Sequence, residues 1–411
     1  MKNLLVSCFN LYNGYKRKQN DKYIRKGLAS GEFGKGTILN FHECGTKISV
    51  FKECTNETIS LAPIYKNIQS GSFVIDWPEI ALWKIKNAVV YNHSDFIKVE
   101  NGIVWPKFFK ANFINCIPKD SNLVSYSDHD VIIKRGKKQI KINTAYSLLG
   151  VYSDIWSHGT SEYFPKITEI SSALSDYNGV EKLKVLVPNY SDKQFKDIMY
   201  EAIMSNPNVE IVEVEDDVEV LVETLYIMDR PARFNDHCDY VEIGDSTQPA
   251  KVAEVLRDKL VKPLLSRYGN EINSYTGSRK LYLVRRGTYR AMKNFHEVEE
   301  FFVGKGFVLV EPHKLSMAEK VAMFNNAEYI VGPYSSAFSN TIFCKPGTKA
   351  LVFSNNSFSY EGYIVMHQQH FGIYVLRVTG TDIYENSLIH CDYFVPLDKI
   401  KDACEYHGIP L

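Results

Sequence analysis

The sequence predicts an α/β fold, and two contrasting patterns carry this prediction. In the first 145 residues, short alternating apolar runs are broken by turn residues, as in β-hairpins. From Thr144 onward, apolar strand-like runs alternate with segments of helical periodicity, as in proteins with parallel sheets. At 411 residues the chain is long enough for two domains with full cores.

Short strands are expected in the β-rich region at residues 47–51, 72–75, 88–91, 96–99 and 131–133. The pair Asn101-Gly102 predicts a tight hairpin, because both residues tolerate the positive φ angles of such turns. The basic run 134–138 contains Arg135-Gly136, which we interpret as a turn between two strands with solvated lysines at its rim. A weak contact of this run with anionic lipid is the alternative.

The α/β region contains alternating helices and strands, expected at residues 153–176, 183–187, 192–204 and 209–214. A further helix at 249–265 leads into the polar, Gly- and Ser-rich segment 268–278. Polar segments of this kind favour domain boundaries. We therefore expect an N-terminal domain of residues 1–265 and a C-terminal domain of residues 266–411.

The C-terminal domain carries a strand-to-helix turn suited to a phosphate group. A buried strand at 329–331 is followed by a Gly-Pro turn of small and hydroxyl residues, a second helix, a Pro-Gly turn and another strand. A helix start offers unpaired backbone N–H groups and the positive end of the helix dipole. The candidate donor-binding residues here are Gly332, Tyr334, Ser335, Ser336 and, within the second helix, Asn340. The alternatives are an empty turn and an Asn340 side chain bonded back to a neighbouring turn.

Three arginines follow the preceding strand. Residues 280–284 form a strand that ends at Arg285 and Arg286, and Arg290 follows shortly after. The next helix and strand are expected at residues 294–303 and 307–310. Two successive strand–helix–strand units would place these arginines and the Gly332 turn at one sheet edge. Guanidinium groups bind phosphate oxygens in a bidentate way, so the arginines are candidate diphosphate ligands, with a solvated basic loop as the alternative. Adjacent residues leaving a strand face opposite ways, so Arg286 could equally face solvent.

His158 and Glu162 lie four residues apart on a predicted helix, so their side chains share one face. A carboxylate beside a histidine fixes its tautomer and raises its basicity, as a general base near neutral pH requires. We interpret the pair as catalytic, with His158 or Glu162 as the base. The alternative is a surface ion pair or a buried histidine with satisfied hydrogen bonds. Asp154 heads the same helix and is a candidate N-cap.

At these residues the chain resembles glycosyltransferase family 61, a family of inverting sugar transferases. The segment Asp154-Ile-Trp-Ser-His158-Gly-Thr-Ser-Glu162-Tyr-Phe-Pro165-Lys166 is similar to the family signature Asn-Tyr-Tyr-His-Trp-x-x-Glu-x-x-Pro-Arg. The resemblance extends over roughly residues 85–380. Matches to the C-terminal motifs of the family are Arg285, Arg286, Arg290, Asn294, Glu297, Gly306-Phe307, Ala327, Gly332-Pro333, Asn340, Phe343, Pro346 and Gly347.

The chain also departs from the family pattern in its C-terminal half. Tyr334 stands where the family has the histidine of Gly-Pro-His-Gly-Ala, and Ser335 and Ala337 replace the two glycines of that turn. Lys320 replaces the usual glutamine, and Phe353 the usual acidic residue. A tyrosine hydroxyl can still donate a hydrogen bond to a phosphate. These substitutions are expected both for a transferase with a different donor nucleotide and for a protein that has lost the activity.

The resemblance implies a GT-B-like fold, in which two Rossmann-like domains face a cleft, here with an added β-rich region in the N-terminal domain. It implies an inverting glycosyltransferase that moves a sugar from a nucleotide-sugar donor to a glycan or lipid-linked glycan acceptor. Capsule or O-antigen polysaccharide biosynthesis is the expected setting. The nucleotide sugar, expected to be UDP-type, is a co-substrate, and no cofactor is expected. The alternative is a non-catalytic scaffold of a polysaccharide assembly complex that binds glycan or a partner, for which Tyr334 and Phe353 are the main support.

No metal role is expected, because the arginines can neutralise the charge of a diphosphate. Asp128-His129-Asp130 looks like the Asp-x-Asp motif that holds a cation in another glycosyltransferase fold, but it precedes a strand instead of ending one. His367 and His370 have helical spacing, but no third ligand is obvious.

Charge and hydropathy limit the expected partners and compartment. Lys and Arg together number 48 and so do Asp and Glu, so no electrostatic attraction to nucleic acid is expected. The chain has no apolar run of 18 residues, and its start has too short an apolar core for a signal peptide. The eight scattered cysteines are expected to be reduced thiols. We therefore expect a cytoplasmic protein with at most peripheral contact to the inner face of the membrane.

Overall fold

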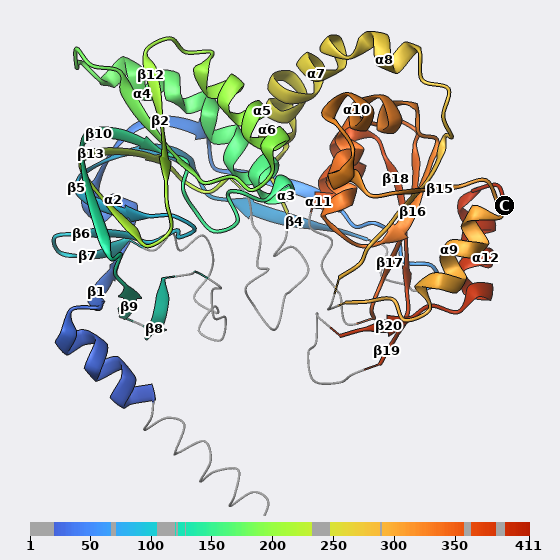
Figure 1. Ribbon diagram of the computed structural model, residues 1–411, viewed down its shortest axis with the longest axis horizontal. Coiled ribbons are helices and arrows are strands. Elements are labelled where there is room, and N and C mark those ends of the chain that lie inside the picture. The colour runs from blue at the N-terminus through green and yellow to red at the C-terminus, as the bar shows by residue number, and fades with distance from the viewer. Residues whose placement is uncertain are drawn as a thin grey trace, which may run out of the picture.

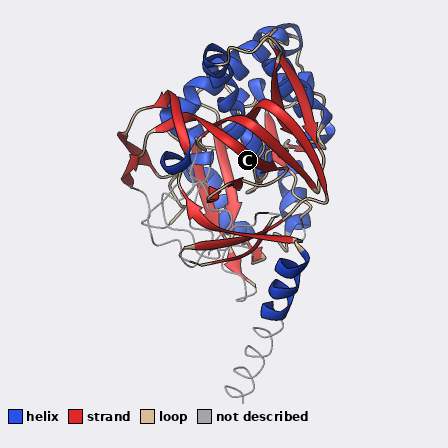
Figure 2. Cartoon of the chain, turned by 90° about the vertical axis from the view of Figure 1, so that its left-hand side faces the viewer, coloured by secondary structure: helices blue, strands red, loops and turns tan. Residues whose placement is uncertain are grey.

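The computed structural model describes residues 20–66, 71–104, 120, 122–127, 129–231, 247–287, 290–356, 363–383 and 391–411. It has a mixed α/β architecture with two main sheets, one in the N-terminal part and one in the C-terminal part (Figure 1). Residues 20–30 form a helix that stands apart from both sheets in Figures 1 and 2. The predicted α/β class is confirmed.

The larger sheet joins the predicted β-rich and α/β regions. Its strand order is β12-β11-β10-β13-β5-β6-β7-β1-β9-β8, with β2 paired to β5. Strands β12, β11, β10 and β13 are parallel, whereas β5 runs antiparallel to β13. The bounds are Phe33–Leu39 for β1, Gly45–Lys52 for β2, Ile80–Tyr91 for β5, Ile97–Val99 for β6, Gly102–Val104 for β7, Leu123–Tyr126 for β8, Asp130–Lys134 for β9, Lys138–Ser147 for β10, Leu183–Pro188 for β11, Val209–Val214 for β12 and Val218–Met228 for β13.

Both turns predicted in this region are present. Val99 of β6 pairs with Gly102 of β7 in an antiparallel hairpin, so the two turn residues are Glu100 and Asn101. Neither Asn101 nor Gly102 has a positive φ angle, so the predicted reason for this turn is wrong. Strand β9 ends at Lys134 and β10 begins at Lys138, so Arg135-Gly136 lies in the turn between them. Strands β3 and β4, Thr55–Ser60 and Ser72–Trp77, form a separate two-stranded sheet, and α2 is the short helix Phe41–Cys44.

The helix predicted at residues 153–176 forms, but its geometry changes along its length. It begins as α3 (Trp156–His158), continues as a π-helix, η2 (Gly159–Tyr163), and a 3-10 helix, η3 (Phe164–Glu169), and ends as α4 (Ile170–Asp176). The N-cap is Ile155, so the prediction of Asp154 at this position is wrong; Asp154 lies 3.5 Å from the ring of His93 instead. Helix α5 (Lys193–Met204) follows β11 and has Asp192 as its N-cap.

The smaller sheet is parallel, in the order β15-β14-β16-β17-β18. The predicted strand–helix–strand units are confirmed, because β14 lies between β15 and β16 in parallel register. The bounds are Lys280–Leu283 for β14, Phe295–Val303 for α9, Val308–Val310 for β15, Pro312–Lys314 for η5, Met317–Asn326 for α10, Tyr329–Pro333 for β16, Ser336–Phe343 for η6, Lys349–Ser354 for β17, Tyr363–Phe371 for α11, Tyr374–Thr379 for β18, Thr381–Asp382 for β19, Tyr393–Phe394 for β20 and Leu397–His407 for α12.

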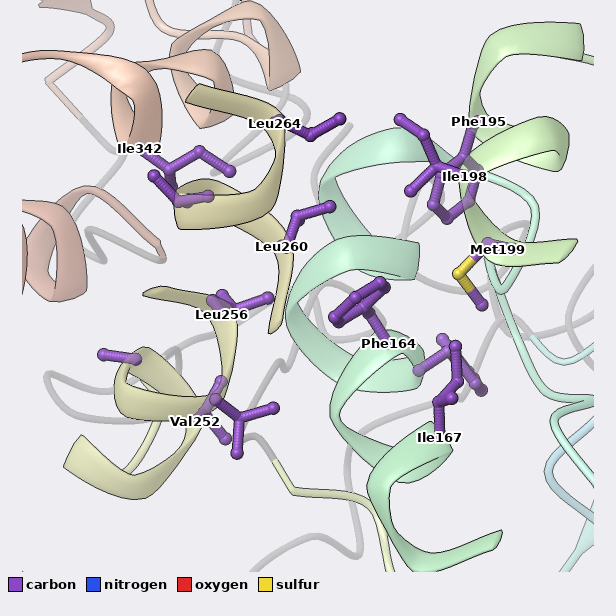
Figure 3. Close-up of a cluster of buried hydrophobic side chains, with 14 of the residues drawn as sticks. Phe164, Ile167, Phe195, Ile198, Met199, Val252, Leu256, Leu260, Leu264 and Ile342 are labelled. Carbon is purple, nitrogen blue, oxygen red and sulfur yellow. The ribbon is translucent and has the colours of Figure 1, made fainter. Parts of the chain in front are cut away.

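A helical segment connects the two parts, with bounds Ala250–Leu256 for α6, Arg257–Val261 for the π-helix η4, Lys262–Arg267 for α7 and Gly269–Asn273 for α8. Its buried side chains belong to a core cluster that also contains residues of both sheets, such as Leu183 and Val352. Figure 3 shows Leu256 and Leu260 of this segment between Phe164 on one side and Ile342 on the other. One continuous core therefore links the two parts, and the predicted domain boundary stays a prediction.

Within the described residues, no helix is long and apolar enough to cross a bilayer. Five cysteines of the described part, Cys44, Cys54, Cys344, Cys391 and Cys404, are not disulfide-bonded. Cys8, Cys116 and Cys238 lie outside the described residues.

Candidate active site

His158 and Glu162 form a direct contact on the turn from α3 to η2. His158 Nδ1 lies 2.6 Å from Glu162 Oε1. The Glu162 side chain is fully buried and that of His158 is 14% exposed, so the pair lies at a surface with its carboxylate inward. The ring of Tyr152 lies 4.9 Å from the ring of His158. The Glu162 side chain is therefore not at the surface, and the catalytic interpretation of the pair stays a prediction.

An arginine that the sequence did not single out completes this pair. Arg230 Nε donates a hydrogen bond to Glu162 Oε2, and Arg230 Nη1 donates one to Asp95 Oδ2 at 3.3 Å. Burial would raise the pKa of Glu162, but the charge of Arg230 and the hydrogen bond from His158 hold it below its usual range. Glu162 is therefore an ionised carboxylate with both oxygens engaged.

Lys166 lies next to this cluster and occupies the position of the arginine in the family signature. Its ammonium lies 4.9 Å from the centre of the Tyr163 ring, and burial lowers its pKa to about 8. A cavity of about 20 Å³ beside it is lined by Asp95, Arg230 and Lys166 together with Ser94, Ser147 and apolar side chains. A cavity of this size holds one or two waters, not a sugar ring.

Gly332 and Pro333, predicted as part of a turn, are instead the last residues of β16, and Gly332 is tightly packed against the neighbouring strand. Gly332 has φ 154°, and a Cβ at this position would lie 2.5 Å from the Leu283 carbonyl oxygen. The predicted second helix is the 3-10 helix η6, with Ser335 as its N-cap and Ser336 as its first residue. Asn340 is buried, and its Nδ2 donates to the Ala337 carbonyl at 2.9 Å. The predicted alternative of a bond to a neighbouring turn is therefore present.

The arginines after β14 divide into two groups. Arg286 forms a bidentate ion pair with Glu299 of α9, at 2.5 and 2.8 Å, and lies over the ring of Phe295. Arg285 and Arg290 both act electrostatically on the buried hydroxyl of Tyr393. Burial raises the pKa of this hydroxyl, and the charges of both arginines act in the opposite direction. Two of the three predicted arginines therefore lie within electrostatic range of the same hydroxyl.

The predicted Tyr334 lies at the same place. The guanidinium of Arg290 is 6.0 Å from the centre of the Tyr334 ring. The backbone N–H of Tyr334 donates to the Phe353 carbonyl at 2.8 Å, and the hydroxyl of Tyr393 donates to the same carbonyl at 3.2 Å. Tyr334, which follows β16, is thus bound to the Phe353 carbonyl of β17 and lies near the guanidinium of Arg290.

The residues at the start of β20 contact the segment 291–293, which directly follows Arg290. The sequence did not suggest this contact. Asp392 accepts a hydrogen bond from the backbone N–H of Ala291 at 2.8 Å and pairs with Lys293 at 2.6 Å. Residues Met292 and Tyr393 form an isolated parallel bridge. Arg290 has φ 51°, a conformation that these contacts stabilise in a non-glycine residue.

The two predicted motifs meet where α3 packs against η6. Trp156 of α3 lies 6.3 Å, ring to ring, from Phe343 at the end of η6. Lys320 of α10, at the position of the family glutamine, has its ammonium 5.7 Å from the centre of the Trp156 ring, and burial lowers its pKa. The helix of His158 and Glu162 therefore lies against the helix that follows the Gly-Pro turn.

Residues with metal-like spacing have other partners. Asp130 pairs with Lys35 at 2.8 Å, and Asp128 lies outside the described residues. His367 is buried, with its Nδ1 2.6 Å from Thr341 Oγ1, and burial lowers its pKa to about 3. In the described ranges no three His, Cys, Asp or Glu side chains cluster as a metal site.

The basic run of the N-terminal part is matched by acidic side chains. Arg135 pairs with Glu219 at 3.1 Å, Lys137 with Asp217 at 3.1 Å, and Lys138 with Glu215 at 3.2 Å. These contacts agree with a solvated turn. The alternative contact with anionic lipid stays a prediction.

Comparison with protein families gives a match for this region. The family model described as Glycosyltransferase 61 matches residues 156–351, a narrower range than the resemblance predicted from the motifs. The matched range contains His158, Glu162, Arg230 and the complete turn after β16. No curated protein matches the chain. Residues 156–351 are therefore a glycosyltransferase 61 domain, and the activity of that family is the transfer of a sugar from a donor to an acceptor.

Proposed function

We propose that the chain is an inverting glycosyltransferase that moves a sugar from a nucleotide-sugar donor, expected to be UDP-type, to a surface polysaccharide acceptor. The packing of α3 against η6 carries the proposal, because it supports a location of the His158–Glu162 pair near the helix that follows the candidate donor turn. An acceptor base and a leaving-group site must lie within one sugar ring of each other for a single displacement.

In this mechanism His158 is the base. Its Nδ1 is bound to Glu162, so Nε2 is the nitrogen that takes the proton from the acceptor hydroxyl. The acceptor oxygen then attacks the anomeric carbon of the donor sugar while the bond from that carbon to the diphosphate oxygen breaks. Attack from the face opposite the leaving group inverts the anomeric centre. Glu162 stabilises the imidazolium that forms, as a buried carboxylate does beside a catalytic histidine.

The leaving nucleoside diphosphate is bound at the carboxyl ends of β14 and β16. Arg285 and Arg290 neutralise its charge, and the backbone N–H groups of Ser335 and Ser336 at the start of η6 donate hydrogen bonds to it. Arg286 takes no part, because Glu299 occupies its guanidinium. With two arginines present, the proposed reaction uses no metal ion.

The wider setting of the proposal follows the family resemblance. The parallel portions of the two sheets correspond to the two Rossmann-like domains of a GT-B enzyme, with the donor on the C-terminal one. Capsule or O-antigen assembly at the cytoplasmic face of the membrane supplies a suitable acceptor. The buried network of His158, Glu162 and Arg230 favours catalysis over the alternative of a non-catalytic scaffold, because a scaffold has no need of an ionised carboxylate beside a histidine.

Isothermal titration calorimetry with UDP, GDP, CMP and dTDP tests the donor site. We expect saturable binding of one nucleotide that a chelator does not change. Replacing Arg285 with Ala is expected to weaken binding at least 10-fold, because a charge-assisted bond to phosphate contributes about 1.5–3 kcal/mol.

Arg279→Ala is the matched control for this experiment. Arg279 precedes β14, whereas Arg285 follows it, and Arg279 pairs with Glu328 at the opposite sheet edge. The control is expected to bind nucleotide like the unmodified chain. Equal binding by Arg285→Ala and Arg279→Ala would refute the site, and no binding of any nucleotide by the unmodified chain would favour the scaffold.

A further inference from the structure

Arg230 is a cation between the buried carboxylate of Glu162 and the partly exposed carboxylate of Asp95, next to the candidate base. It follows the end of β13, with its side chain 10% exposed. It contacts Glu162 through Nε and Asp95 through Nη1. One guanidinium thus bridges a carboxylate of the π-helix and a carboxylate of the loop between β5 and β6.

Charge balance shows why this arrangement needs both contacts. Glu162 alone in an apolar site would take up a proton, because burial disfavours the ionised form. The positive charge of Arg230 keeps Glu162 ionised. The negative charge of Asp95 also acts on Arg230, so two carboxylates balance the charges of Arg230 and a protonated His158. The ionised state of the Glu162 carboxylate, which faces His158, therefore depends on Arg230, a residue 68 positions away along the chain.

Hydrogen bonds of Asp229, the neighbour of Arg230, and of the Asp95 backbone anchor the residues around the bridge. Next to Arg230, the Asp229 carboxylate accepts hydrogen bonds from the N–H of Ala81 at 2.8 Å and from Trp83 Nε1 at 2.9 Å. The backbone N–H of Asp95 donates to Asp120 at 2.9 Å. These contacts fix the guanidinium relative to β5 and hold Asp95 in reach.

We propose that Arg230 and Asp95 are positioning residues of the transferase: together they hold the ionised Glu162 carboxylate against His158 Nδ1 and so make His158 Nε2 the base. This inference rests on the proposed function, which names His158 as the base. Neither residue touches the reacting atoms in this assignment.

Other titratable groups lie around Arg230, Asp95 and Glu162 and contribute to the expected pH dependence of His158. Lys166 approaches from η3, with its ammonium in the field of Asp95, Arg230 and Glu162. The Tyr163 hydroxyl donates to Asp95 Oδ1 at 3.3 Å and to the Val151 carbonyl at 2.9 Å. Asp120 lies behind Asp95, and burial raises its pKa to about 7. These groups are present in every variant below, so differences between variants report on the bridge.

The test is ¹⁵N-histidine NMR on the full-length chain without substrate, which reads the tautomer and titration midpoint of each ring. His158→Gln assigns the signals of His158. In the unmodified chain we expect His158 to carry its proton on Nδ1 when neutral. In Arg230→Gln, loss of the neighbouring positive charge is expected to raise the pH at which the His158–Glu162 pair takes up a proton by about one unit. Arg230→Lys retains the charge and is expected to restore most of this midpoint, and Asp95→Asn is expected to lower it.

Arg135→Gln is the matched control, because Arg135 forms a bidentate pair with the buried Glu219 at the other end of β13. It is expected to cost similar stability and to leave His158 unchanged. If Arg230→Gln unfolds the chain, Asp95→Asn carries the test. A His158 midpoint in folded Asp95→Asn equal to that of the unmodified chain would overturn the proposal. Failure of the proposed function is distinct: it would appear as normal sugar transfer by His158→Gln, whatever the NMR of the Arg230 variants shows.

Discussion

The geometry of Glu162 bears on which residue of the predicted pair acts as the base. The sequence left His158 and Glu162 as alternatives, because spacing shows only that they share a face. Both oxygens of Glu162 are engaged, and its pKa is lowered although burial acts in the opposite direction. A carboxylate held as an anion with both oxygens donated to is a poor proton acceptor. The geometry therefore favours His158 over Glu162 as the general base.

Replacing His158 with Ala, or Glu162 with Gln, is expected to lower transfer by about 100- to 10,000-fold, the usual range for a lost general base. Nucleotide affinity is expected to stay unchanged, because the proposed donor residues lie on other elements. Initial rates and calorimetry on the same preparations provide the measurement. Glu299→Gln is the control, since Glu299 is also buried and paired with an arginine. Loss of nucleotide binding in the His158 variant would contradict this division of roles.

At the scale of elements, periodicity found the helix of residues 156–176 but not its irregular course. Gly159, the first residue of the π-helix Gly159–Tyr163, lets the chain pass close to α5, since a Cβ on Gly159 would lie 2.1 Å from the Phe195 ring. π-helical turns occur frequently at functional sites. No sequence pattern distinguishes such a turn from regular helix, because the apolar spacing differs by a fraction of a residue.

The close approach of Gly332 in β16 to the neighbouring strand gives a prediction about the stability of the parallel sheet. Gly332→Ala is expected to lower the free energy of unfolding by at least about 2 kcal/mol, since its Cβ would meet the Leu283 backbone of the neighbouring strand. Urea denaturation measures this loss. Gly306→Ala is the control, because Gly306 also has a positive φ, 83°, but has open space around it. The control is expected to lose about 1 kcal/mol, and equal losses in both variants would contradict the close-approach argument.

The sequence predicted the strands and turns well where local chemistry decides them. The Asn101-Gly102 hairpin, the βαβ units around Arg285 and Gly332, and the contact of His158 with Glu162 all follow from spacing within one or two elements. Arg230 and Asp95 could not be found in this way. They meet across 135 residues, and neither lies in a recognisable motif. The only available signal was the position of Arg230 directly after a long apolar strand.

At the scale of the whole molecule, the site depends on contact between two parts that are distant in sequence. The core cluster around the linking helices contains N-terminal residues such as Phe195, C-terminal residues such as Phe338, and Leu260 between them. Figure 3 shows the labelled part of this cluster, with Leu260 and Leu264 projecting between helices. The relative position of His158 and the donor turn is therefore fixed by apolar packing, which no local pattern in the sequence encodes.

Leu260→Ala tests this coupling. Leu260 is 2% exposed, and its truncation is expected to cost about 2–5 kcal/mol through lost burial and the cavity left behind. If the core links both parts, hydrogen exchange is expected to accelerate in β11 and in β17 alike, measured by mass spectrometry of peptides from each strand. Ile133→Ala is the control, because the cluster of Ile133 contains only N-terminal residues, and it is expected to leave β17 protected. Faster hydrogen exchange in only one of these two strands in Leu260→Ala would mean that the two parts open independently. The distance from His158 to the donor turn would then change with that opening, and nucleotide binding would be expected to favour the joined state.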